Sequence, residues 1–161
     1  MEKLNIIYVD DQREVLLTLS KDLQVFEKHC TVEECESADE AMELIDEIDK
    51  AGDHVAVIIS DHIMPGASGV EFLTRINKDP RFRQTRKMLL TGLATHQDTI
   101  EAINQAGIDK YIEKPWKSDD LVKAVKVLLT HYIFSKGLDY EGLTPVLDQL
   151  TLLDYLQRRV D

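Results

Sequence analysis

Five polar side chains suited to phosphoryl chemistry sit at the ends of short, mostly apolar or β-branched runs. Asp10 and Asp11 follow "LNIIYV", and Asp61 follows "VAVIIS". Thr91 ends "KMLLT", and Lys114 ends "DKYIEK". Carboxylates attract hard divalent ions such as Mg²⁺, which uses one or two carboxylates together with waters and phosphate oxygens. An aspartate can itself act as a nucleophile and form an acyl phosphate, with an ammonium and a hydroxyl to bind the phosphoryl oxygens.

The segments around these residues predict alternating strands and helices. Strands are expected at 4–9, 31–35, 55–60, 87–91 and 109–114. Helices are expected at 12–27, 37–48, 69–79, 97–106 and 118–133, with Ser37, Ser68 and Ser118 as N-caps. This alternation predicts an α/β fold, in which a five-stranded parallel sheet is doubly wound with helices on both faces.

Strand order decides whether the five side chains meet. In the order 2-1-3-4-5, the first, third, fourth and fifth strands are neighbours, and their carboxyl ends share one edge of the sheet. Two unit charges about 4 Å apart repel by roughly 1–4 kcal/mol at effective dielectric constants of 80 to 20. Three clustered carboxylates therefore need positive charge, which Mg²⁺ and Lys114 would supply.

Longer motifs around these residues resemble a known family. The motifs are "VDD" at 9–11, "SDHIMPGASG" at 60–69, "LLTG" at 89–92 and "AGIDKYIEKP" at 106–115. In this order and spacing they resemble the receiver domain of bacterial two-component response regulators, the family that includes the chemotaxis response regulator. The resemblance covers roughly residues 3–133.

The resemblance implies a role for each residue of the cluster. Asp61 would be the phosphoacceptor. Mg²⁺ would be held by Asp10, Asp11, Asp61 and the backbone carbonyl of Ile63. Lys114 would bind a phosphoryl oxygen.

Four further positions follow from the same resemblance. A cis peptide would precede Pro115, and Thr91 and Tyr111 would form the switch pair. Ile63 and Leu93 occupy positions that tune attack by water on the acyl phosphate. Both are apolar here, so we expect slow loss of the phosphoryl group.

The expected function is a phosphorylation-dependent switch, not an enzyme acting on other substrates. A histidine kinase or phosphotransfer protein would supply the phosphoryl group. The output face would comprise helix 97–106, strand 109–114 and helix 118–133. One alternative is a Mg²⁺-dependent phosphatase with an aspartyl-phosphate intermediate, but that chemistry wants a second acid where Ile63 stands. Another is a flavin-binding protein of similar topology, but no hydroxyl-rich phosphate loop follows the first strand.

The composition of the chain limits the kinds of partner it can bind and indicates the compartment in which it works. The net charge of −11 argues against non-specific nucleic-acid binding and against docking on anionic membranes. No apolar run approaches the ~20 residues of a membrane span, and the N-terminus lacks a signal-peptide pattern. Cys30 and Cys35 are expected to be free thiols in a reducing cytoplasm.

Residues 134–161 lie beyond the resemblance. We expect a linker and then an amphipathic helix from Thr144 to about Arg159, with Pro145 at its first position. Its apolar stripe could pack on the receiver, pair with a second copy or bind a downstream protein; the sequence favours the last two. The segment is too short for a typical DNA-binding or enzymatic output domain. Trp116 could be either an exposed handle for a partner or a packing residue beneath the last receiver helix.

Overall fold

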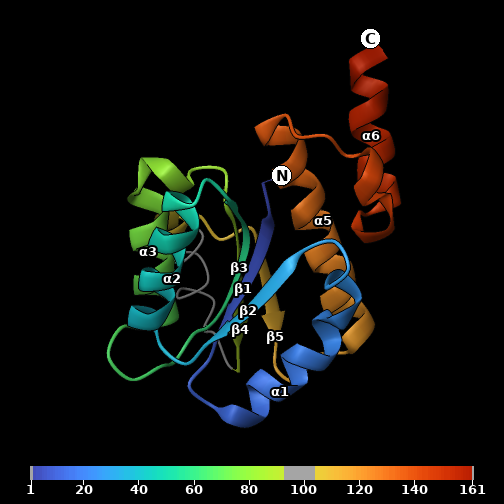
Figure 1. The fold of residues 1–161 in the computed structure, drawn as a ribbon. Coiled ribbons are helices and arrows are strands. Elements are labelled where there is room, and N and C mark those ends of the chain that lie inside the picture. The colour runs from blue at the N-terminus through green and yellow to red at the C-terminus, as the bar shows by residue number, and fades with distance from the viewer. Residues whose placement is uncertain (1, 93–103, 161) are drawn as a thin grey trace.

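Five parallel strands form one sheet in the order β2-β1-β3-β4-β5 (Figure 1). The computed structural model describes residues 2–92 and 104–160, the side chains of 159 and 160 excepted. The strands are β1 (Leu4–Val9), β2 (Thr31–Cys35), β3 (His54–Asp61), β4 (Arg86–Thr91) and β5 (Lys110–Glu113). The predicted fold class and strand order are confirmed.

Strand bounds differ from the prediction where they matter for chemistry. β3 extends one residue further at each end than predicted, so Asp61 is the last residue of the strand. β5 ends at Glu113, so Lys114 lies just beyond it. β1 is buried along its whole length, as its unbroken apolar run predicts, whereas β2 is a partly exposed edge strand.

Helices cover both faces of the sheet. α1 and α5 lie on one face, and α2 and α3 lie on the other (Figure 1). The helices are α1 (Arg13–Asp22), α2 (Ala38–Lys50), α3 (Gly69–Lys78), α5 (Ser118–Lys136) and α6 (Gln149–Val160), with short 3-10 turns η1 (Leu23–Phe26), η2 (Pro80–Phe82) and η3 (Glu141–Val146). Of the predicted helix 97–106, residues 97–103 lie outside the described residues. No helix in the described part of the chain is both long enough and apolar enough to span a bilayer.

The predicted caps are partly right. Ser37 and Ser68 each accept a hydrogen bond from the backbone N–H three residues on, at 3.1 Å. Ser118 is not a cap: it is the first helical residue of α5, and Lys117 occupies the N-cap without a side-chain bond. α5 also continues to Lys136, three residues beyond the predicted end, and its C-cap Gly137 adopts a left-handed conformation.

The tail helix starts later than predicted. Thr144 and Pro145 lie in η3, and α6 begins at Gln149. Asp148 takes the capping role, because its carboxylate accepts from the backbone N–H and the hydroxyl of Thr151, at 3.0 and 2.6 Å. A carboxylate at a helix N-terminus is also favoured by the helix dipole.

Part of the tail's apolar stripe packs on α5. Val146, Leu147 and Leu152 are buried in the core cluster on the α1/α5 side of the sheet. Leu150 and Leu153 are 76% and 51% exposed. The three buried side chains therefore adopt the intramolecular packing that the sequence ranked below self-association or partner docking.

An aromatic contact fixes α6 against α5. The Tyr155 ring stacks on Phe134 with 4.5 Å between centroids, and its hydroxyl lies 2.6 Å from His131 Nδ1. Burial lowers the pKa of His131, and so does the positive charge of Arg86 and of Arg158. His131 therefore resists protonation in the folded state.

We expect the stability of the protein to fall on mild acidification, partly through His131. An unfolded histidine, with its pKa near 6.5, takes up a proton before the folded one does. The contribution of His131 is therefore complete above about pH 6.5 and declines as pH falls towards the lowered pKa. Urea midpoints at about pH 7.5 and about pH 5.5 would measure this, because His131→Gln should lose less stability between them. Equal losses in the two proteins would contradict this assignment.

Gly69 lets α3 begin directly against the end of β3. Its N–H donates to the carbonyl of His62 at 2.8 Å. A Cβ at this position would collide with the backbone carbonyl oxygen of Asp61. With a side chain at residue 69, the backbone of the short loop 62–68 would have to shift.

We expect Gly69→Ala to destabilise the fold by roughly 1–3 kcal/mol, since the added methyl group must displace backbone. Gly142→Ala is a matched control, because nothing lies within 4 Å of a Cβ there and the change should stay within about 0.5 kcal/mol. Urea unfolding followed by circular dichroism would compare the two. Equal stability of the two variants would show that the loop relaxes freely.

Candidate functional site

Three carboxylates meet at the carboxyl edge of the sheet. Asp10 and Asp11 follow β1, and Asp61 ends β3, the strand beside it. One oxygen from each of the three lies within 4.8 Å of the others. Asp10 is fully buried, Asp61 is nearly so, and Asp11 is exposed. The cluster therefore has a buried base and one side open to solvent.

Asp10 is the carboxylate of this cluster whose charge is disfavoured by its surroundings. Burial raises its pKa, and the nearby charges of Asp61 and Asp11 raise it further. The backbone N–H of Gln12, which donates to Asp10 Oδ1 at 2.8 Å, and the charge of Lys114 act in the opposite direction. The other oxygen, Oδ2, is buried and has no hydrogen-bond partner among the described residues. An unsatisfied carboxylate oxygen beside two more carboxylates suits an oxygen-seeking cation such as Mg²⁺.

Lys114 places a positively charged side chain next to the three carboxylates. Its Nζ lies 2.6 Å from Asp61 Oδ1 and 3.5 Å from Asp10 Oδ2. Its backbone N–H donates to the carbonyl of Thr91 at 2.8 Å, and its peptide bond to Pro115 is cis. The end of β5 is therefore tied to the end of β4, with the ammonium directed at the carboxylates.

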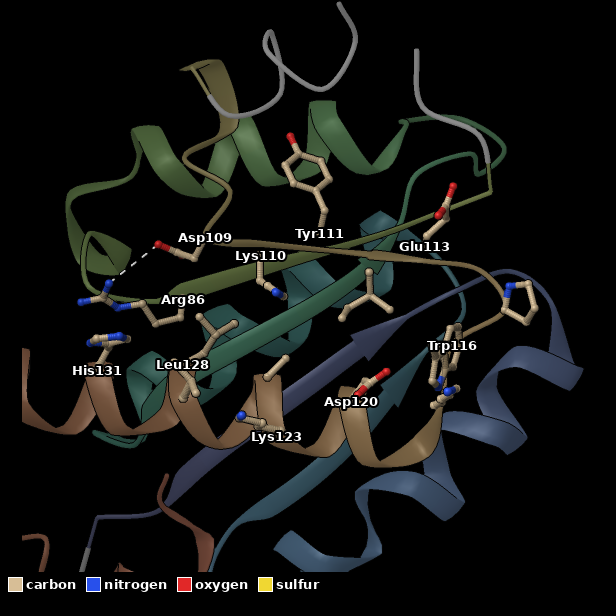
Figure 2. Close-up of a pocket in the computed structure, with 15 residues that line it drawn as sticks. Arg86, Asp109, Lys110, Tyr111, Glu113, Trp116, Asp120, Lys123, Leu128 and His131 are labelled. Atoms are coloured by element: carbon tan, nitrogen blue, oxygen red, sulfur yellow. Dashed lines mark ion pairs between the residues drawn. The ribbon is translucent and has the colours of Figure 1, made fainter. Parts of the chain in front are cut away.

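Thr91 and Tyr111 project from the same face of the sheet. Tyr111 is paired with Leu89 in the parallel β4–β5 ladder, and Leu89 and Thr91 alternate onto one face. Thr91 is buried, and its hydroxyl has no hydrogen-bond partner among the described residues. Tyr111 is half-buried against the α2/α3 side of the core, and burial raises its pKa. Figure 2 shows its ring on the side of β5 away from α5.

Three further predicted positions are Ile63, Leu93 and Trp116. Ile63 is 78% exposed in the loop after β3, and Met64 beside it is buried. Leu93 lies outside the described residues. Trp116 follows the cis proline and is a packing residue: its ring is half-buried against the α1/α5 side of the core.

One contact at this edge escaped sequence reasoning. The indole N–H of Trp116 donates to Asp22 Oδ2 at 2.8 Å. Asp22 is the last residue of α1, far from Trp116 in sequence, and neither residue type nor spacing marks the pair. Only the folded arrangement brings the two together.

Comparison with known proteins assigns the family. Residues 6–126 match the family model described as response regulator receiver domain. The chain is 33% identical to the hydrogenase transcriptional regulatory protein HoxA of Cupriavidus necator over 125 residues, which are 78% of this chain and 24% of that protein. It is 29% identical to the response regulator Rre1 of Synechocystis over 133 residues, 80% of this chain and 52% of that protein. The chain thus spans about a quarter to a half of the length of these relatives.

A solved structure agrees with this match. The signal receiver domain of an HD domain-containing protein from Pseudomonas fluorescens Pf-5 is 27% identical and superposes with a TM-score of 0.71. That similarity covers 85% of this chain and 94% of the other. With the carboxylate cluster and the strand order in place, the chain belongs to the family of response regulator receiver domains.

Proposed function

We propose that this receiver domain is a switch that accepts a phosphoryl group on Asp61 from a histidine kinase or a phosphotransfer protein. The observation that carries the proposal is the contact of Asp61 with Lys114 inside a cluster of two further carboxylates. One carboxylate would serve as nucleophile while the others hold a cation. Receiver domains are signalling domains, and in this chain the signal would be the phosphorylation of Asp61.

The residues suited to Mg²⁺ are Asp10, Asp11, Asp61 and the backbone carbonyl of Ile63. Asp10 Oδ2, which is buried and accepts no hydrogen bond from the described residues, supports this assignment. When bound, the metal would supply positive charge to the phosphoryl oxygens and relieve the repulsion among the carboxylates.

The transfer itself needs only a small set of groups from this chain. An oxygen of Asp61 attacks phosphorus, a P–O bond forms, and the P–N bond of the donor phosphohistidine breaks as the imidazole leaves with the electron pair. Lys114 exchanges its contact with the Asp61 carboxylate for one with a phosphoryl oxygen. The hydroxyl of Thr91, which has no hydrogen-bond partner within residues 2–92 and 104–160, is buried at the end of the neighbouring strand and would donate to a second phosphoryl oxygen.

Movement of Thr91 would carry the signal to Tyr111. The two side chains share one face of the sheet, so a shift of the hydroxyl leaves space into which the aromatic ring can turn. The affected face includes β5 and α5, together with the predicted helix 97–106, which falls largely outside the described residues. Couplings of this kind are typically about 1–3 kcal/mol, which shifts a poised equilibrium without refolding the domain.

The output is proposed to be a protein contact in the cytoplasm. A downstream partner, or a second copy held through α6, would read the changed face, and the exposed Leu150 and Leu153 are suited to such a contact. The net charge of −11 argues against a direct nucleic-acid contact by this chain. The phosphatase alternative finds no support: Ile63 occupies the position of the second acid.

We expect incubation with acetyl phosphate and Mg²⁺ to add one phosphoryl group to the protein. The transfer breaks the P–O bond to acetate and forms an acyl phosphate on Asp61. Intact mass spectrometry would detect the adduct, and Asp61→Asn should abolish it. Asp119→Asn is a matched control, because Asp119 lies in the exposed first turn of α5 and should leave the adduct unchanged. Labelling that survives in Asp61→Asn would overturn the assignment of the acceptor.

We also expect the adduct to persist for minutes or longer after the donor is removed. An exposed apolar side chain at Ile63 neither binds nor activates an attacking water. Ile63→Asn, which offers an amide to that water, should shorten the lifetime severalfold without changing the site of labelling. A wild-type lifetime of seconds would show that Ile63 does not protect the acyl phosphate.

A further inference from the structure

Trp116, the single tryptophan of the chain, links the turn that follows Lys114 to α1. Its indole N–H donates to Asp22 at 2.8 Å. Trp116 lies in the turn after β5, two residues beyond Lys114, and Asp22 ends the helix that follows Asp10 and Asp11. The bond therefore ties the turn that carries the ammonium to the far end of α1, the helix that begins just after the two carboxylates.

The indole ring is only partly enclosed by the core against which it packs. On one side lies a cavity of about 750 Å³ between β5 and α5, with Trp116 at one end (Figure 2). On another side lies a cavity of about 360 Å³ between α1 and the Lys114–Pro115–Trp116 segment. A ring that borders two cavities lacks neighbouring atoms on both of those sides, and so loses their dispersion contacts. The hydrogen bond to Asp22 therefore adds to the core packing in fixing the orientation of the ring.

Lys114 needs external support to hold its position. A lysine side chain has a flexible four-carbon stem, and ordering it has a substantial entropic cost. On the β5 side, the backbone of Lys114 is fixed by its N–H bond to the carbonyl of Thr91. On the other side, Trp116 is anchored by its hydrogen bond to Asp22 and its packing on the core. Together these two anchors hold the backbone from which the ammonium reaches Asp61 at 2.6 Å.

We propose that Trp116, held by Asp22, is a positioning residue that keeps Lys114 within reach of the phosphoacceptor and so sets the rate of phosphoryl acceptance. The inference rests on the proposed function of Asp61. Trp116 and Asp22 touch neither the donor nor the reacting atoms; they act through Lys114.

Removing the indole N–H tests the link. Trp116→Phe keeps an aromatic ring but cannot donate to Asp22. Adduct formation with saturating acetyl phosphate and Mg²⁺ should slow about tenfold, in line with the loss of one hydrogen bond to a charged group. Asp22→Leu should slow it similarly. Asp22→Asn is the matched control, because its side chain retains an oxygen that accepts the bond, and its rate should stay within about twofold of wild type.

A double-mutant cycle separates positioning from a general structural role. In a Lys114→Ala background, Trp116→Phe should cause no further slowing, because the group that it positions is already absent. A merely structural role would slow the reaction in both backgrounds. The urea midpoint of each variant, followed by circular dichroism, verifies that the proteins compared are folded.

The results of these experiments distinguish failure of the proposed function from failure of the positioning role. A wild-type protein that forms no adduct defeats the proposed function itself. If the wild type is labelled and Trp116→Phe is labelled equally fast, the positioning role alone is wrong. The same holds if Trp116→Phe slows labelling by the same factor in the Lys114→Ala background as in the wild type. If Trp116→Phe does not fold, the Asp22→Leu and Asp22→Asn pair decides, and equal rates in these two would overturn the proposal.

Discussion

The rest of this structure must offset the electrostatic repulsion among three clustered carboxylates. Asp10 is fully out of water beside Asp61, and both burial and its neighbours disfavour its charge. A buried charge persists only if paired or hydrogen-bonded, and the chain supplies Lys114 and the backbone N–H of Gln12. Those groups come from different segments, so the cluster exists only when β1, β3 and β5 are in their correct places. Their relative placement is thus a condition of the chemistry as well as of the fold.

The parallel sheet meets that condition through burial on both faces. β1 and β3 are almost wholly buried, because their apolar runs pack against α1 and α5 on one face and α2 and α3 on the other. Asp61 ends β3, and Asp10, Asp11 and Lys114 lie within two residues of the ends of β1 and β5, so the packed strands limit how far their mutual repulsion can move these groups apart. Gly69 shows how closely the surrounding chain fits, since α3 begins in contact with the carbonyl of Asp61. The same packing that stabilises the domain thus sets the spacing of its reactive groups.

Sequence patterns predicted those parts that depend on local interactions. The alternation of apolar runs and helical patterns predicted the parallel sheet covered on both faces, and the caps at Ser37 and Ser68 are bonds within three residues. The cap expected at Thr144 failed because Asp148, four residues on, offers a charged acceptor that the pattern could not rank above it. The docking of the tail on α5 and the bond between Trp116 and Asp22 join distant segments, and no local preference encodes either contact. Contacts between residues that are distant in sequence can be identified only once the tertiary structure shows which residues lie side by side.

The incomplete pairing of Asp10 has a functional meaning. Lys114 lies closer to Asp61 than to Asp10, at 2.6 against 3.5 Å, and Asp10 Oδ2 is left without a hydrogen bond among the described residues. A site in which one ammonium satisfied every carboxylate oxygen would have little affinity for a cation or a phosphoryl group, because binding would have to break good contacts. Asp10 Oδ2, whose ion pair with Lys114 is long, and the Thr91 hydroxyl, which has no hydrogen bond among the described residues, instead leave an acceptor and a donor that can bind a ligand without breaking a good hydrogen bond. The local instability of the free site is therefore the source of its capacity to bind, and the well-packed strands around it are what allow that instability to persist.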